Sequence, residues 1–147
     1  MQRLYTELQV SIKKHDIESR FISFCDHDIK HPVTNKVYYT TSVTDKFSYI
    51  KIALKLIPTF IKTVQVIRGI DKEHNIAYMI STGPGIAILT ALYFKLKRKK
   101  IIHIETWSRF YSKSLTGRFM YYLADEFIIQ NKELFQLYPK AVYKGRL

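Results

Sequence analysis

Residues 81–85, Ser-Thr-Gly-Pro-Gly, join two apolar segments through a turn whose composition suits an anion or a sugar. Gly83 and Gly85 permit backbone angles that are closed to other residues, and Pro84 favours the first turn of a helix. The free amides at a helix N-terminus point outward at the positive end of the helix dipole. A plain strand-to-helix connector can have the same composition, so the turn is either a binding site or a structural link.

A second polar cluster follows the apolar segment 101–104: Glu105-Thr106-Trp107-Ser108-Arg109. A carboxylate, two hydroxyls, an indole and a guanidinium can bind sugar hydroxyls, stack on a sugar face and hold a phosphate. The alternative is a salt-bridged loop, in which Glu105 pairs with Arg109 and Trp107 covers the sheet edge. Parallel sheets bind ligands at the carboxyl ends of their strands, where both clusters are expected to lie.

Hydrophobic periodicity predicts the elements that position these clusters. Strands are expected at 18–24, 36–41, 76–80, 100–105, 126–130 and 141–144, and helices at 2–14, 46–68, 86–96, 114–123 and 132–137. Asp45 is a candidate cap for helix 46–68, and Pro58 is expected to kink or break it. Alternating strands and helices predict an α/β fold, with a Rossmann-like parallel sheet covered by helices on both faces. Because no linker or repeat interrupts the chain, we expect one domain over 1–147.

The composition limits the class of partner. The chain has 147 residues, 47% of them apolar, and a formal net charge of +12, so it should fold and should meet an acidic partner or surface. Nucleic acid, anionic lipid, or an anionic subunit or substrate would each serve. The single cysteine, Cys25, excludes an internal disulfide and is expected to be a buried strand residue. Neither a signal peptide nor an apolar run long enough to cross a bilayer is evident, so we expect any membrane contact to be peripheral.

The segment 46–68 combines a broad apolar surface with cations and has no acidic residue; its cations include Lys51, Lys55 and Lys62. A basic amphipathic segment of this kind can lie in the headgroup layer of an anionic membrane. The alternative is a core helix with a solvated basic edge.

Other chemistries have weaker support. His27 and His31 lie in a polar loop, but the histidines lack metal-ligand spacing, so we expect no metal site and no cofactor. Ser108 and Ser114 lack the Gly-x-Ser-x-Gly turn of a hydrolase nucleophile.

Several ordered motifs together carry a resemblance to a known family: 81–85, 104–109, 114–117, 123–125, Gln130 and 138–141. Over about residues 46–145 the chain resembles the membrane-recruiting, acceptor-side subunit of the split UDP-N-acetylglucosamine transferase of asparagine-linked glycosylation. It is equally similar to the bacterial relatives of that subunit in capsule and exopolysaccharide assembly. The resemblance implies the acceptor half of a GT-B glycosyltransferase, docked peripherally at the cytoplasmic face of the membrane. It also implies a separate nucleotide-sugar-binding subunit, a polyprenyl-pyrophosphate-linked sugar acceptor and no nucleic acid.

The resemblance further implies roles for single residues. Glu105 would be catalytic, through contact with the acceptor hydroxyl, and the pyrophosphate or sugar would be bound by Thr82, Gly83, Gly85 and Arg109. Family members normally begin with a strand and a Gly-rich loop, whereas this sequence starts at Met1 within the helix that should follow them. An internal start, a degenerate relic, or another segment filling the gap would each account for this. The alternative functions are a basic nucleic-acid-binding module and an inactive truncated scaffold.

Overall fold

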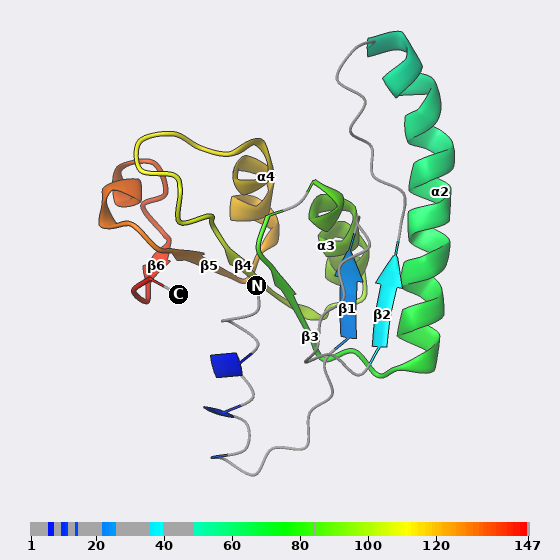
Figure 1. Cartoon of the computed structure of the whole chain (residues 1–147), viewed down its shortest axis with the longest axis horizontal. Coiled ribbons are helices and arrows are strands. Elements are labelled where there is room, and N and C mark those ends of the chain that lie inside the picture. Colours follow the sequence, from blue (N-terminus) through cyan, green and yellow to red (C-terminus); the bar gives the residue numbers. More distant parts are fainter. Residues whose placement is uncertain are drawn as a thin grey trace. The chain divides into compact units, whose positions relative to one another are not determined.

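The computed structural model describes most of the chain after residue 48 and parts of the chain before it (Figure 1). The described residues are 6, 7, 10, 11, 14, 22–25, 36–39, 49–83 and 85–146, with the backbone alone at 25, 36, 39 and 49–60. The chain divides into two compact units, Met1–Lys62 and Thr63–Leu147. The expectation of a single domain over 1–147 stays a prediction.

The first unit contains a parallel pair of strands, β1 (Ile22–Cys25) and β2 (Lys36–Tyr39). The described residues of segment 2–14 are helical, as expected. Helix α2 (Tyr49–Glu73) starts in this unit and ends in the next. It continues through Pro58, so of the two predicted effects the break is wrong, and the kink stays a prediction. A proline removes one backbone hydrogen bond, and the rest of a 25-residue helix outweighs that loss. Asp45, His27 and His31 lie outside the described residues.

The second unit is a four-stranded sheet in which every neighbouring pair is parallel. Its strands, in the order β3-β4-β5-β6, are β3 (Tyr78–Ser81), β4 (Lys100–Ile104), β5 (Glu126–Ile129) and β6 (Val142–Tyr143). The connections contain α3 (Ile86–Leu96), α4 (Leu115–Leu123) and the 3₁₀ helix η1 (Lys132–Gln136). The predicted α/β class with a Rossmann-like parallel sheet is confirmed.

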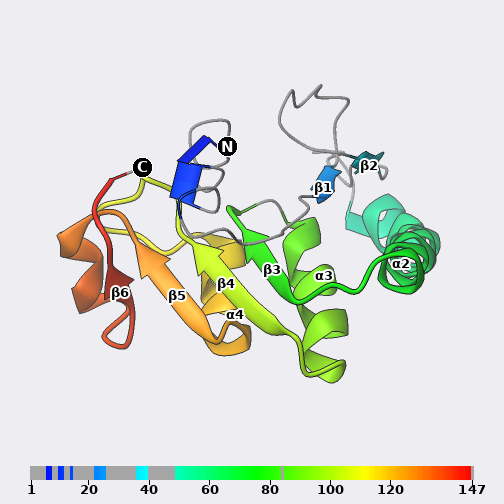
Figure 2. The same ribbon diagram turned by 90° about the horizontal axis from the view of Figure 1, so that it is seen from below.

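Helices α3 and α4 pack beside each other against the sheet (Figure 2). Alternate residues of β4 face these helices, so Ile101 and His103 are fully buried. The buried side of α3 includes the small residues Ala87 and Ala91, and the buried side of α4 includes Met120. None of the helices within the described residues has the length and hydropathy to span a membrane.

Candidate functional site

The parallel register brings the two predicted clusters to one edge of the sheet. Ser81, the last residue of β3, lies opposite His103 on β4, so the turn 82–85 and the loop 105–114 both leave the carboxyl edge. Gly83 has φ of 123°, which requires glycine. Gly85 has φ of −57° and ψ of −27°, ordinary values for any residue, so the expectation of special angles at Gly85 is wrong. Pro84 lies outside the described residues.

Glu105 extends from the end of β4 into the protein and is only 2% exposed. Three donors reach its carboxylate. The Thr106 backbone N–H donates to Oε1 at 3.0 Å, and the Ser114 hydroxyl lies 3.0 Å from both carboxylate oxygens. The Tyr138 hydroxyl donates to Oε2 at 3.1 Å. A buried carboxylate with these donors is satisfied within the chain.

The start of α4 is built around this carboxylate. Ser114 is the N-cap of α4, and its hydroxyl accepts a hydrogen bond from the Gly117 N–H at 2.8 Å while donating to Glu105. A Cβ at position 117 would overlap Glu105 Oε2 and lie 2.7 Å from both the Ser114 and Tyr138 oxygens. Glycine is therefore required at 117 because the carboxylate occupies the space that a side chain would need.

Burial of Tyr138, and secondarily the charge of Glu105, raise the pKa of the Tyr138 hydroxyl well above its ordinary value of 10.0. The hydroxyl therefore keeps its proton and remains a donor to the carboxylate. His103, the residue before Ile104 on β4, packs beside Phe127, with the two ring centroids 5.1 Å apart. Burial lowers the pKa of His103 from 6.5 to about 4, so this imidazole is neutral at pH 7.

The proposed pairing of Glu105 with Arg109 does not occur among the ion pairs of the described residues. Arg109 instead donates to the Ser112 hydroxyl at 3.0 Å. Trp107 is 60% exposed, which disfavours the alternative in which it covers the sheet edge. The loop turns outward after Thr106, which leaves the indole in solvent.

Two residues at the end of β5 hold this loop. Gln130 donates through Nε2 to the Glu105 carbonyl at 2.9 Å, and Asn131 donates through Nδ2 to the Trp107 carbonyl at 2.7 Å. The role of Asn131 was missed from the sequence, although its position at the carboxyl end of the strand adjacent to β4 was the available signal. The C-terminal segment also reaches the loop: the Arg146 guanidinium lies 5.8 Å from the Trp107 ring centroid and 5.6 Å from that of Phe110.

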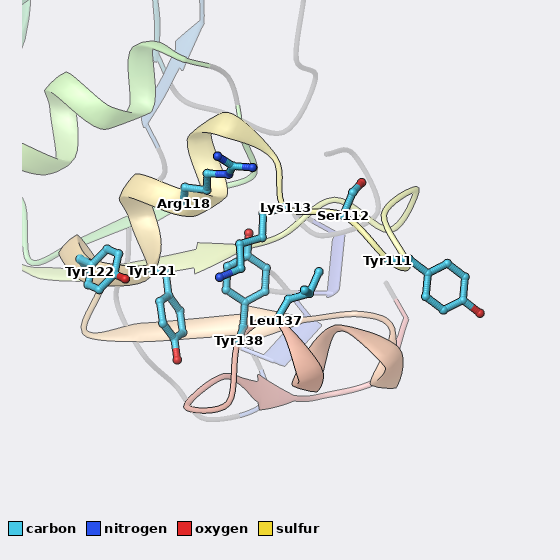
Figure 3. A pocket seen from close by; sticks show the side chains of 8 residues that line it. All are labelled: Tyr111, Ser112, Lys113, Arg118, Tyr121, Tyr122, Leu137 and Tyr138. Carbon is cyan, nitrogen blue, oxygen red and sulfur yellow. The ribbon is translucent and has the colours of Figure 1, made fainter.

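A hollow of about 640 Å³ opens beside the Glu105 carboxylate, between α4, the loop before it and the residues after η1 (Figure 3). We call it the α4 pocket; its lining residues are Tyr111, Ser112, Lys113, Arg118, Tyr121, Tyr122, Leu137 and Tyr138. The Lys113 ammonium lies 5.2 Å above the Tyr138 ring, and the rings of Tyr121 and Tyr138 lie 5.1 Å apart. The lining thus combines cations with stacked aromatic rings.

The predicted membrane cations are only partly described. Lys62, near the middle of α2, is exposed. Lys51 and Lys55 lie on the same helix, with the backbone alone described. Among the described residues no group of metal-ligating side chains gathers.

Comparison with known proteins extends this picture. The sequence profile of a family described as "Oligosaccharide biosynthesis protein Alg14 like" matches residues 42–147. The "UDP-N-acetylglucosamine transferase subunit ALG14" of Kluyveromyces lactis is 32% identical over 106 residues, which cover 68% of this chain and 43% of the relative. The subunit of the same name from Homo sapiens is 32% identical over 75 residues, covering 47% of this chain and 35% of the relative. No solved structure matches the chain significantly.

The parallel sheet and the loops at its carboxyl edge define a Rossmann-like α/β protein. The match over residues 42–147 then places the chain in a family: it belongs to the Alg14-like oligosaccharide biosynthesis proteins. The chain spans less than half the length of the curated relatives that it matches.

Proposed function

We propose that this chain is the acceptor-side subunit of a two-chain glycosyltransferase that transfers a sugar from a nucleotide sugar to a polyprenyl-pyrophosphate-linked acceptor. The observation that carries the proposal is the family match over residues 42–147, which includes both clusters at the carboxyl edge of the sheet. The relatives are named as subunits of a UDP-N-acetylglucosamine transferase, so UDP-N-acetylglucosamine is the donor to test first. Lipid-linked oligosaccharide synthesis and capsule or exopolysaccharide synthesis are the two candidate settings.

In this proposal the acceptor lies across the carboxyl edge of the sheet. Thr82, Gly83 and Gly85 supply backbone groups at the start of α3 for the pyrophosphate or the sugar, since N–H groups at a helix N-terminus favour anions. Arg109, which is exposed in the loop after β4, supplies a cation that can hold a phosphate in a fork of two hydrogen bonds.

The contact predicted between Glu105 and the acceptor hydroxyl stays a prediction. The described geometry favours a positioning role, since all three donors to the carboxylate come from the chain itself. Glu105→Gln separates the two roles when sugar transfer is measured in the reconstituted pair of chains. A loss of kcat of about a hundredfold or more in a variant that is fully folded at the assay temperature supports contact with the hydroxyl. Recovery of transfer at a lower temperature, in step with recovery of folding, supports positioning.

We propose that the partner subunit docks on the C-terminal segment, residues 138–147. Strand β6 is an edge strand of its sheet, and Val142 and Tyr143 are both exposed there. An unpaired edge with exposed side chains is a surface suited to another chain. The test is co-purification of the nucleotide-sugar-binding chain from the same organism with the parental chain and with Val142→Lys/Tyr143→Lys. Equal capture by both would contradict docking at β6.

We propose that the chain contacts the membrane peripherally at the cytoplasmic face, through Lys51, Lys55 and Lys62 of α2. Replacing all three by Glu turns attraction to anionic lipid into repulsion at the same sites, so co-sedimentation with anionic vesicles at low salt should be lost. The matched control replaces three exposed lysines outside α2, Lys100, Lys132 and Lys140, by Glu. Vesicle binding that falls equally in both triple variants would reflect net charge alone and would reject the assignment to α2.

A further inference from the structure

The outer surface of α4 carries a stripe of exposed apolar side chains. Leu115, Phe119 and Tyr122 follow one another at helical spacing and are 71%, 52% and 82% exposed. Exposed aromatic and aliphatic side chains gathered on one face of a soluble domain typically mark a docking surface. The opposite side of the same helix is buried through Thr116, Gly117 and Met120. Packing of the core therefore does not explain the apolar side chains of the stripe.

The charge around this stripe has one sign. From Thr106 to Ala124 the sequence has no acidic residue, and its charged residues are Arg109, Lys113 and Arg118. Two of these cations line the α4 pocket, and each of the other lining residues is neutral. Among the described residues that line the pocket none is acidic, and the nearby Glu105 carboxylate is buried and accepts hydrogen bonds from Ser114 and Tyr138. The lining of the pocket thus presents two cations to a ligand.

The side chains that line the pocket also have the character of a membrane interface. Four tyrosines and Leu137 surround the two cations, and Figure 3 shows Lys113 in front of the Tyr138 ring with Arg118 extending from α4. Tyrosine, with an apolar ring and a polar hydroxyl, concentrates at the level of lipid headgroups, where Lys and Arg bind phosphate. A protein partner would also match an apolar stripe, but an acid-free cationic pocket beside the stripe favours a surface rich in phosphates.

We propose that the α4 pocket binds the phosphate of an anionic phospholipid while Leu115, Phe119 and Tyr122 enter the membrane interface. This inference deepens the proposed function and rests on it, since it adds a second membrane contact beside the acceptor loop. The loop 105–114 leads directly into α4, so docking through α4 brings Glu105 and Arg109 to the membrane surface. A polyprenyl-linked acceptor has its sugar and pyrophosphate at that level.

Trp107 provides a readout inside this loop, because it is the only tryptophan of the chain and is exposed. The experiment adds vesicles of phosphatidylcholine alone, or of phosphatidylcholine and phosphatidylserine in equal parts, to the full chain. We expect Trp107 emission to move to shorter wavelength, and the chain to co-float, with the mixed vesicles only. Lys113→Gln/Arg118→Gln should bind these vesicles roughly thirtyfold more weakly, since each cation near the surface contributes about 1 kcal/mol.

The variants are matched. Phe119→Ser/Tyr122→Ser removes the apolar stripe and should abolish the Trp107 shift, whereas Lys72→Gln/Lys100→Gln removes the same charge elsewhere and should preserve the shift. All replaced side chains except that of Lys113 are exposed, so an unchanged thermal midpoint confirms that the fold is intact. The charge-reversed variant of Lys51, Lys55 and Lys62 is measured in parallel.

Three outcomes would overturn the inference. If both α4 variants bind vesicles as tightly as the parental chain, the membrane contact lies elsewhere. It lies on α2 if only the charge-reversed α2 variant loses vesicle binding. A Trp107 shift with inorganic phosphate at the same phosphate concentration, without vesicles, makes the pocket a site for a free anion. If the chain binds vesicles of phosphatidylcholine alone as tightly as the mixed vesicles, the charge of the lipid has no role in binding. The proposed function is tested separately, by sugar transfer in the reconstituted pair with the acceptor dispersed in neutral detergent. Because this assay contains no anionic membrane, the proposed function and the membrane contact of α4 can fail independently.

Discussion

The replacement Glu105→Gln should destabilise the fold, because the Glu105 carboxylate holds three donors in a buried site. Oε1 accepts from the Thr106 N–H at 3.0 Å and Oε2 accepts from the Tyr138 hydroxyl at 3.1 Å, while Ser114 lies within reach of both. Glutamine keeps the size of the side chain but offers one acceptor oxygen and one NH₂ group. At least one donor therefore loses its acceptor, and the remaining hydrogen bonds lose the contribution of the charge.

The magnitude follows from these contacts. A hydrogen bond to a charged group contributes about 1.5–3 kcal/mol and a neutral one about 0.5–1.5 kcal/mol, so two weakened bonds and one lost bond total roughly 4–5 kcal/mol. The neutral amide is cheaper to bury than a carboxylate, which offsets part of this loss. We expect Glu105→Gln to lower the free energy of unfolding by about 2 kcal/mol. Glu105→Ala, which leaves every donor without an acceptor and adds a cavity, should cost about 4 kcal/mol.

The assay is urea unfolding followed by circular dichroism at pH 7, with the slope and midpoint fitted for each variant. Glu133→Gln is the matched control, since Glu133 is an exposed glutamate in the first turn of η1 and should change stability by less than about 0.5 kcal/mol. If Glu105→Gln unfolds like Glu133→Gln, the carboxylate does not hold the loop and α4 together, and the positioning role is wrong.

Three further predictions concern the same unit. The contribution of His103 to the free energy of unfolding should be full above pH 6.5 and should fall as the pH drops toward 4. Burial lowers the pKa of His103 from 6.5 to about 4, so on acidification the unfolded chain binds a proton at this histidine before the folded chain does. His103→Leu should remove roughly 3 kcal/mol of that decline in urea unfolding measured across this pH range. Gly83→Ala should lower the free energy of unfolding by about 1–2 kcal/mol, because φ at Gly83 is 123°. Gly85→Ala, at φ of −57°, should be neutral or stabilising by less than about 1 kcal/mol. The thermal midpoints of the two variants test this difference. Gly117→Ala should destabilise more than Gly83→Ala, because its Cβ would overlap the Glu105 carboxylate, and an equal thermal midpoint for the two would contradict the packing described at α4.

The sequence was sufficient to predict the elements of the second unit. Helix α3 has the predicted bounds, 86–96, and strands β4 and β5 differ from their predictions by a single residue at one end. These elements combine a strong apolar pattern with clear boundaries, such as the glycine turn before α3 and Ser114 before α4. Helix α2 was predicted less well. A proline is a strong local signal for the end of a helix, but α2 is long and continues through Pro58.

The candidate site was predicted as a location more successfully than as a set of contacts. The carboxyl edge of the sheet follows from alternating strands and helices, so the approach of residues 82–85 and 105–109 to one edge was accessible from the sequence. The partners of Glu105 were not, because Ser114 and Tyr138 are separated from it by 9 and 33 residues and meet it only through packing. Sequence spacing offered only the alternative of a pair with Arg109, four residues away, and the ion pairs of the described residues do not include it.

In the proposed function, this chain supplies the acceptor side of a transferase and a second chain supplies the donor side. The most direct measurement is transfer of labelled N-acetylglucosamine from UDP-N-acetylglucosamine to a polyprenyl-pyrophosphate-linked N-acetylglucosamine acceptor. It is made with this chain, with the nucleotide-sugar-binding chain of the same organism, and with both. The proposed function predicts a stable complex and transfer only when both chains are present. Failure of the two chains to associate, or transfer by the second chain alone at the rate of the pair, would contradict it.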